Sequence, residues 1–197
     1  MYQIYGPKQS SSFRCIWVAE ELGVQYENIV VSMQDKEHKS PEFMKMNPNG
    51  KVPVLKHGDF VVWESLAICN YMVDSEKSDF AGATAEERAL VWQWSLWSML
   101  HLHQPFEKIM SYKWFKKPED EAAVEARAQL PKWLEILDAA LAGKEYLVAD
   151  RFTLADLTVA SIVHAATMIS YDLSAYTHVC AWRDRIGERP TIKKLMA

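Results

Sequence analysis

Short apolar runs with strand-like spacing alternate with helical patterns in the first part of the chain. Gly23 directly follows the first helical pattern and supplies its stop. The resulting order of elements is β-α-β-α-β-β-α. Strands are predicted at residues 2–5, 26–31, 52–55 and 60–63, and helices at 13–22, 40–46 and 65–73.

The connections between these elements decide how the strands pair. Only residues 56–59 separate the last two strands, which is too short for a crossover, so this pair is expected to be antiparallel. The first two strands have a helix between them and are expected to be parallel. The first part of the chain is therefore predicted to form a mixed sheet with helices on its faces.

After residue 78 the strand patterns stop and long amphipathic helical patterns follow. This change divides the chain into two predicted domains, 1–78 and 84–197. The second domain is predicted to be all-α. Its helices are expected at residues 85–114, 119–142, 153–169 and 175–187, with a short tail helix after Pro190.

One helix start in the second half has a specific capping pattern. Thr153 is followed three residues later by Asp156, which predicts an N-cap and its reciprocal partner, and Phe152 is placed to pack on Leu157. A carboxylate that accepts backbone N–H groups at a helix start is held ionised and is already occupied. We therefore expect Asp156 to have a structural role rather than one as an acid or base.

Composition and charge narrow the functional classes. The 197 residues are 49% apolar and 24% charged, which is enough to bury a sizeable core. The net charge of −4 comes without a basic stripe, which argues against nucleic-acid binding. The N-terminus lacks a signal-peptide pattern, and no apolar run approaches the roughly 18 residues that span a bilayer. We therefore expect a cytoplasmic protein without membrane contact.

The cysteines and histidines give no sign of a metal site or a disulfide. Cys15, Cys69 and Cys180 form no CxxC pair and lie within apolar patterns, so we expect buried structural thiols. His101 and His103 are two residues apart and point to different sides of a helix, so no metal site is expected there.

Residues 47–55 combine a turn with an unusual strand start. In Asn-Pro-Asn-Gly at 47–50, the proline presets φ and Asn-Gly tolerates positive φ. Pro53 follows Val52 at the edge of a predicted strand, where its missing N–H does not break a central ladder. A cis bond at this step would turn the backbone N–H and C=O of Val52 outward, where they could pair with an extended peptide ligand.

Several spaced motifs together resemble one known family. They are the strand and loop 4–7, Ser10 with Arg14 after it, the segments 20–27, 40–43, 47–55 and 64–68, and the cap around Asp156. With these motifs the chain resembles the cytosolic glutathione S-transferases, in particular the bacterial, serine-type, theta-like pattern. The resemblance implies a thioredoxin-like, glutathione-binding domain over 1–78, an all-α domain over 84–197 that contributes a hydrophobic substrate pocket, and a homodimer.

The resemblance also implies which residues meet glutathione, the co-substrate of the family. Glu64 would hold the ammonium of the γ-glutamyl group, and Ser65, at a helix N-terminus, would hold its carboxylate. Val52, followed by Pro53, would pair with the cysteinyl backbone. The glycyl carboxylate would be met by the basic residues Lys51, His38 and Lys39.

Transferase chemistry needs the sulfur of glutathione as a thiolate, whereas a free thiol with a pKa of about 8.5 is mostly protonated at neutral pH. A hydroxyl that donates to the sulfur at a helix start would lower the thiol pKa. The theta-like pattern, counted back from Arg14, makes Ser10 the predicted donor and Ser11 the second choice. The alternatives are a backbone amide as the donor and a serine cluster that only caps the helix.

Two other catalytic types of the family are disfavoured. No cysteine occupies positions 9–12, which argues against the glutathione-disulfide chemistry of the Cys-type members. Tyr5 belongs to the first strand and lies too early for the Tyr-type classes.

The second substrate is expected to be an apolar electrophile, because the family places it against the first long helix of the α domain. Trp94, Trp97, Ser98 and His101 are spaced at i, i+3, i+4 and i+7, so they share one helix face that could line the pocket. Trp114 and Phe115 are expected to close the pocket from the helix end. Core packing or a dimer contact explains such an aromatic stripe equally well.

Two other functions stay open beside the transferase. One is a glutathione-dependent peroxidase or reductase of organic substrates, which the same thiolate could serve. The other is a non-catalytic binding module that keeps the fold and the peptide groove. The full set of implied glutathione contacts argues against the inert module.

Overall fold

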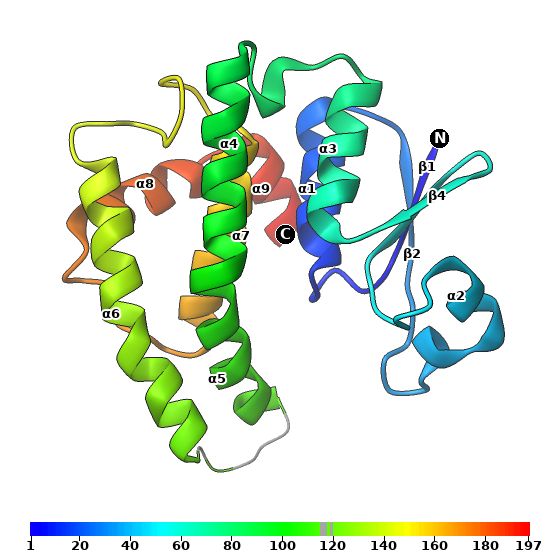
Figure 1. The fold of residues 1–197 in the computed structure, drawn as a ribbon, viewed down its shortest axis with the longest axis horizontal. Coiled ribbons are helices and arrows are strands. Elements are labelled where there is room, and N and C mark those ends of the chain that lie inside the picture. Colours follow the sequence, from blue (N-terminus) through cyan, green and yellow to red (C-terminus); the bar gives the residue numbers. More distant parts are fainter. Residues whose placement is uncertain (115–117, 119) are drawn as a thin grey trace. The chain divides into compact units, whose positions relative to one another are not determined.

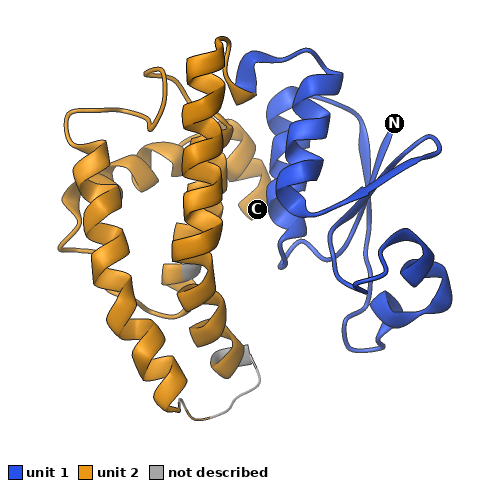
Figure 2. Cartoon of the chain, in the orientation of Figure 1, with its two compact units in different colours: residues 1–80 blue, residues 81–197 orange. Residues whose placement is uncertain are grey.

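The computed structural model describes residues 1–114, 118 and 120–197, apart from the side chains of Lys113, Trp114 and Ala165 (Figure 1). The Cα positions group into two compact units, Met1–Phe80 and Ala81–Ala197 (Figure 2). Among the described residues, no helix has the length and apolar character needed to span a membrane.

The first unit contains strands and helices in the predicted order. The strands are β1 (Tyr2–Tyr5), β2 (Tyr26–Ile29), β3 (Val54–His57) and β4 (Phe60–Trp63). The helices are α1 (Ser12–Leu22), α2 (Pro41–Met46) and α3 (Ser65–Ser75), with short 3-10 turns η1 (Glu37–Lys39) and η2 (Asp79–Ala81).

The strands form one mixed sheet in the order β2-β1-β3-β4. β1 is parallel to β2 and antiparallel to β3, with Tyr5 opposite both Ile29 and Val54. β3 and β4 are antiparallel, joined by the short turn that the sequence indicates. The mixed sheet and both predicted pairings are confirmed.

Three predicted strand boundaries were wrong. The third strand ends at His57 rather than Leu55, because Lys56 and His57 still pair with Gln3 and Tyr2 of β1. The third strand begins at Val54 rather than Val52, because Pro53 has no N–H to donate and the ladder to β1 starts with the next residue. The second strand ends at Ile29 rather than Val31, because its partner β1 ends at Tyr5, which lies opposite Ile29. The turn η1 was not predicted.

Alternation along the strands covers both faces of the sheet. Tyr5 and Val54 pack with Phe43 of α2 on one face. Ile4 and Leu55 alternate with them and are fully buried on the opposite face, which α1 and α3 cover side by side (Figure 1). The two helices are therefore anchored to the same face of the sheet.

Among its described residues, the second unit contains helices joined by loops and no strand, as predicted. Its helices are α4 (Ala85–Trp97), the π-helical segment η3 (Ser98–His103), α5 (Gln104–Trp114), α6 (Glu121–Leu141), α7 (Leu154–Met168), α8 (Thr177–Gly187) and α9 (Pro190–Met196). The helix predicted over 85–114 is thus interrupted by a wider π segment. Apolar periodicity could not reveal it, because a shift to i→i+5 bonding changes the backbone without changing residue types.

The start of α7 is closed by a buried polar network. Asp156 Oδ2 accepts the Thr153 N–H at 3.0 Å and the Thr153 hydroxyl at 3.1 Å. Its Oδ1 accepts the Leu147 N–H and the Trp182 indole N–H, both at 2.9 Å. Burial raises the pKa of Asp156, and these four donors act in the opposite direction. The predicted structural role of this carboxylate is consistent with a group whose oxygens are all occupied.

Candidate active site

Three serines surround the start of α1. The Ser10 hydroxyl donates to the Pro7 carbonyl at 2.7 Å and accepts the Ser12 N–H at 3.2 Å. Ser11 precedes the helix and makes no side-chain capping bond. Ser12 is fully buried as the first helical residue. Ser10 therefore already sits at the positive end of a helix, with a backbone N–H directed at its oxygen.

Gly6 allows the serine loop to approach Val52. Its φ is 135°, and a Cβ at this position would lie 2.1 Å from Ser12 Oγ and 2.9 Å from Val52 Cβ. Any side chain here would push the two segments apart. The start of α1 and Val52, two residues before β3, are thus neighbours, which the sequence did not indicate.

Val52 lies outside strand β3, and its peptide bond to Pro53 is cis. Among the described residues, the backbone N–H and C=O of Val52 have no recorded hydrogen-bond partner. Val52 is half-buried and Pro53 is buried. A residue just outside a strand whose backbone N–H and C=O are unpaired can form hydrogen bonds with an extended peptide.

Asn47 holds the turn that precedes Val52. It is only 3% exposed, and its Oδ1 accepts the Asn49 N–H at 3.1 Å while its Nδ2 donates to the Lys51 carbonyl at 2.6 Å. Sequence reasoning assigned no role to this residue. The signal was an asparagine at the first turn position, where its side chain can replace backbone hydrogen bonds.

The predicted basic residues gather around the same turn. Lys39 Nζ donates to the carbonyls of Asn49 and Gly50 at 3.2 and 2.9 Å. Gly50 has a φ of 56°, and a Cβ there would lie 2.7 Å from that Nζ. His38 Nδ1 is buried without a hydrogen-bond partner in the described residues, and Lys51 is exposed. The turn therefore carries a concentrated positive charge.

Glu64 and Ser65 form the start of α3 in a strained backbone. Glu64 has φ 73° and ψ 119°, outside the left-handed helical region that a non-glycine residue sometimes occupies. Its side chain is exposed and makes no capping hydrogen bond. Ser65 is 5% exposed and is the first residue of the helix. Such strain persists where the surrounding structure requires it, which is common at binding sites.

Arg14 and Cys15 of α1 lie beneath this helix start. Arg14 Nη1 donates to Ser65 Oγ at 3.0 Å, and Cys15 Sγ donates to the Ser65 carbonyl at 3.7 Å. Burial raises the pKa of the Cys15 thiol well above its ordinary value. Sequence reasoning used Arg14 only to count back to Ser10, because nothing local links residues that are 51 positions apart.

The cysteines are free thiols. Cys15 and Cys69 are fully buried, as predicted. Cys180 is half-buried, and its Sγ donates to the Leu173 carbonyl at 3.2 Å, so the prediction of burial was too strong for this residue.

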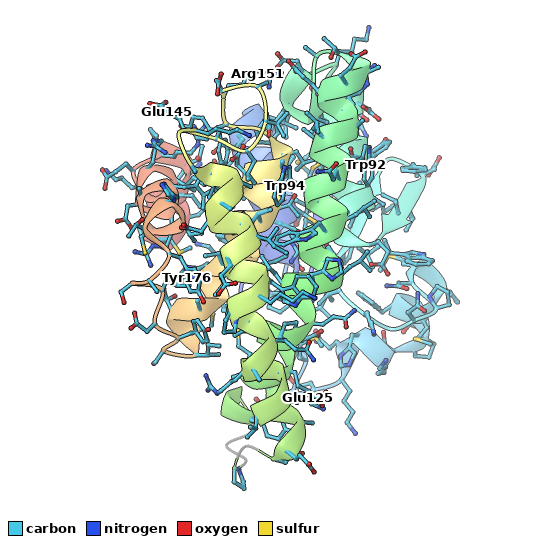
Figure 3. All side chains as sticks on the ribbon, turned by 60° about the vertical axis from the view of Figure 1, so that its left-hand side comes forward. Trp92, Trp94, Glu125, Glu145, Arg151 and Tyr176 are labelled. Atoms are coloured by element: carbon cyan, nitrogen blue, oxygen red, sulfur yellow. The ribbon has the colours of Figure 1, made fainter. Side chains whose placement is uncertain are left out.

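The predicted aromatic stripe lies on α4 and η3 in the second unit. The rings of Trp94 and Trp97 are 5.1 Å apart, and His101 stacks on Trp133 of α6 with centroids 4.3 Å apart. Figure 3 shows Trp94 on the side of α4 toward α6, with Trp92 on another side. Ser98 is fully buried and donates to the Ser95 carbonyl. The stripe thus packs within the helical unit.

Two further predictions concern the helix end at Trp114 and a metal site. Phe115 and the side chain of Trp114 lie outside the described residues, although the backbone of Trp114 ends α5. In the described part of the chain, His, Cys, Asp and Glu side chains form no group of three or more that could hold a metal ion.

The fold defines a class of protein before any comparison. A mixed β2-β1-β3-β4 sheet covered by α1 and α3, followed by a helical unit, is a thioredoxin-like domain with an all-α domain after it. In the first unit, the starts of two helices and the edge residue Val52 gather groups that can bind a small anionic peptide.

Comparison with known proteins gives the family. The model of the glutathione S-transferase N-terminal domain matches residues 2–74, and that of the C-terminal domain matches residues 99–190. Probable glutathione S-transferase GSTF2 of Oryza sativa subsp. japonica is 33% identical over 206 residues, covering 98% of this chain and 94% of the rice protein. The chain belongs to the glutathione S-transferase family.

Solved structures agree over the full fold. Glutathione S-transferase-I bound with lactoylglutathione has a TM-score of 0.89 at 32% identity, covering 98% of this chain and 97% of that one. A poplar glutathione transferase F1 mutant, in which one serine is replaced by cysteine, has a TM-score of 0.89 at 26% identity, with coverage of 99% and 96%. The rice and poplar proteins come from plants, so they leave the bacterial, theta-like subclass a prediction.

Proposed function

We propose that the protein is a glutathione transferase that binds glutathione in its first unit and activates the thiol as a thiolate for attack on an apolar electrophile. The observation that carries the proposal is the convergence around Gly6. The serine loop and Val52 meet there, and Arg14 links the same helix to the Glu64–Ser65 start of α3. The three parts of a γ-glutamyl-cysteinyl-glycine tripeptide each have a matching group.

Each end of glutathione has a complementary charge. The exposed Glu64 carboxylate accepts from the γ-glutamyl ammonium, and the Ser65 hydroxyl and first N–H groups of α3 bind the adjacent carboxylate. Val52 pairs with the cysteinyl backbone, held in place by Pro53. The glycyl carboxylate is met by the basic residues around the turn, namely Lys39, Lys51 and His38.

Ser10 is the proposed thiolate donor. Its oxygen accepts the Ser12 N–H, which polarises the hydroxyl, and its proton points at the Pro7 carbonyl. A bound sulfur anion is a better acceptor than that carbonyl, so the hydroxyl turns to the sulfur. The thiol proton is released to solvent water. The thiolate then forms a bond to the electrophilic carbon, and the leaving group departs with the electron pair of the broken bond.

The second unit supplies the proposed apolar pocket over 84–197. Trp94, Trp97, Ser98, His101 and Trp114 are its proposed lining, and the stacking of His101 on Trp133 would fix that wall. An apolar electrophile suits such a surface, because burying aromatic area stabilises the complex. A homodimer in the cytoplasm, of the serine-type, theta-like subclass, completes the proposal and follows from the family resemblance.

The experiment follows the ultraviolet absorbance of bound glutathione thiolate against pH in the wild type, Ser10→Ala and Ser11→Ala. We expect the wild type to lower the glutathione pKa by at least one unit, which is worth about 1.4 kcal/mol. Ser10→Ala should bind glutathione but leave its pKa near that of free glutathione, and Ser11→Ala should resemble the wild type. If bound glutathione has the wild-type pKa in Ser10→Ala and the pKa of free glutathione in Ser11→Ala, the role belongs to Ser11.

A further inference from the structure

We infer that Arg14 is a positioning residue for the γ-glutamyl carboxylate of glutathione, and that it acts through the Ser65 hydroxyl. The inference rests on the proposed function. It gives a binding role to a buried side chain that donates a hydrogen bond to Ser65.

The contact has the geometry that such a role requires. Arg14 is 4% exposed and Ser65 is 5% exposed, so their 3.0 Å hydrogen bond is shielded from water. A hydrogen bond from a charged donor in a buried place is stronger and better directed than one at the surface. The hydroxyl of Ser65 is therefore fixed in one rotamer before any ligand binds.

This bond also decides what the Ser65 hydroxyl can do. A hydroxyl has one proton to donate and can accept at its lone pairs. The guanidinium N–H occupies an acceptor site of the oxygen. In the described residues the Ser65 proton has no recorded acceptor, so it remains available to an incoming carboxylate. Arginine thus converts a serine that could accept or donate into a donor.

Charge reinforces this arrangement. Ser65 is the first residue of an 11-residue helix, whose N-terminal N–H groups favour an anion. The buried Arg14 guanidinium, which donates to the Ser65 hydroxyl, adds a full positive charge next to that hydroxyl. Both effects favour the carboxylate form of the ligand over a neutral group, so the pair selects ligands with a free carboxylate at this end.

A purely structural role for Arg14 makes a different prediction. The residue joins α1 to α3, so its loss could loosen both helix starts and weaken every ligand equally. A role through Ser65 weakens only ligands that carry the γ-glutamyl carboxylate. An analogue without that group, γ-aminobutyryl-cysteinylglycine, separates the two, because it keeps the ammonium, the thiol and the glycyl end.

The test is calorimetric binding of glutathione and of this analogue to the full chain. The variants are Arg14→Met, Arg14→Lys and Ser65→Ala, with Arg88→Met as the matched control, since Arg88 donates to the carbonyls of Gly82 and Ala83 in the second unit. We expect Arg14→Met to weaken glutathione about tenfold or more and to leave the analogue within about twofold. In a Ser65→Ala background the same change should have little further effect on glutathione.

Equal weakening of both ligands by Arg14→Met would overturn the inference and leave Arg14 a structural residue. If Arg14→Met does not fold, Arg14→Lys decides by the same ratio, because lysine keeps the charge but loses the planar donor geometry. A wild type that binds neither ligand would contradict the proposed function itself. A wild type that binds both ligands with equal affinity would overturn only the inferred use of the carboxylate.

Discussion

Two helix starts in this protein carry a hydroxyl and a carboxylate, and they behave in opposite ways. At α7, Asp156 is fully buried, and its two oxygens accept four hydrogen bonds from within the second unit. At α3, Glu64 is exposed, makes no capping bond and sits at φ 73°. At both helix starts the functional groups are a hydroxyl and a carboxylate. The carboxylate is occupied by internal hydrogen bonds at α7 and is accessible to a ligand at α3.

The difference shows how a structural carboxylate can be told from a binding one. A buried carboxylate whose oxygens are all occupied stabilises the chain and has nothing left for a ligand. A carboxylate held in a strained backbone without an internal partner lowers the stability of the fold. Such strain is retained where function requires it. The two sites should therefore respond in opposite directions to substitution.

The largest expected effect is at Asp156. Asp156→Asn replaces one carboxylate oxygen with an amide NH₂. The NH₂ group cannot accept the hydrogen bonds that the buried N–H and hydroxyl donors make to that oxygen. We expect the free energy of unfolding to fall by about 3 kcal/mol, because buried N–H groups lose their partner. Urea unfolding of the full chain measures it.

Asp150→Asn is the matched control for that change, because Asp150 is exposed and lies in the loop before the same helix. The free energy of unfolding of Asp150→Asn should stay within about 0.5 kcal/mol of the wild-type value. Equal losses in the two variants would mean that the Asp156 network is not what stabilises the start of α7.

The opposite sign is expected at Glu64. Glu64→Gly relieves the positive φ and should raise the free energy of unfolding by about 1 kcal/mol. It also removes the acceptor for the glutathione ammonium, so affinity should fall about tenfold or more in calorimetry. Lys77→Gly serves as the control, since Lys77 is also exposed with φ 52° but lies outside the site. A gain in stability without a loss of affinity would remove Glu64 from the binding site.

A smaller effect tests the other end of α3. Tyr2 donates to Glu76, just past that helix, at 2.6 Å, and burial followed by this bond raises the pKa of Tyr2 to about 12. Because the folded chain holds the proton more tightly, the bond stabilises fully below pH 10 and is lost as pH rises through 12. Tyr2→Phe should cost roughly 1 kcal/mol near neutral pH, and the difference should shrink in that alkaline window. A difference that stays constant with pH would contradict this.

Much of the fold could be predicted from sequence because its signals are local. Short runs of β-prone residues at 2–5 and 60–63 predicted both strands with their observed bounds, and Gly23 marked the end of α1. Pro53 shifted the start of β3, because the effect of a missing N–H on pairing depends on the partner strand. The π segment at 98–103 follows from backbone bonding that residue types do not record.

The candidate site was predicted only in part for the same reason. The turn, the Val-Pro step and the Glu-Ser pair are each contiguous in sequence. The approach of Ser12 to Val52 across Gly6 and the bond from Arg14 to Ser65 join distant segments, so they appear only once the chain is folded. Asn47 was visible in sequence but needed its burial and its two bonds to be recognised.

The central claim is that the starts of α1 and α3 and the edge residue Val52 form one glutathione site, while the start of α7 does not bind. Titrating glutathione into isotope-labelled protein and following backbone amide resonances by NMR tests it most directly. We expect the largest changes at the amides of Val52 and Ser65, and none beyond noise at Thr153. Saturable binding with changes at Thr153, and none at Val52 or Ser65, would contradict it.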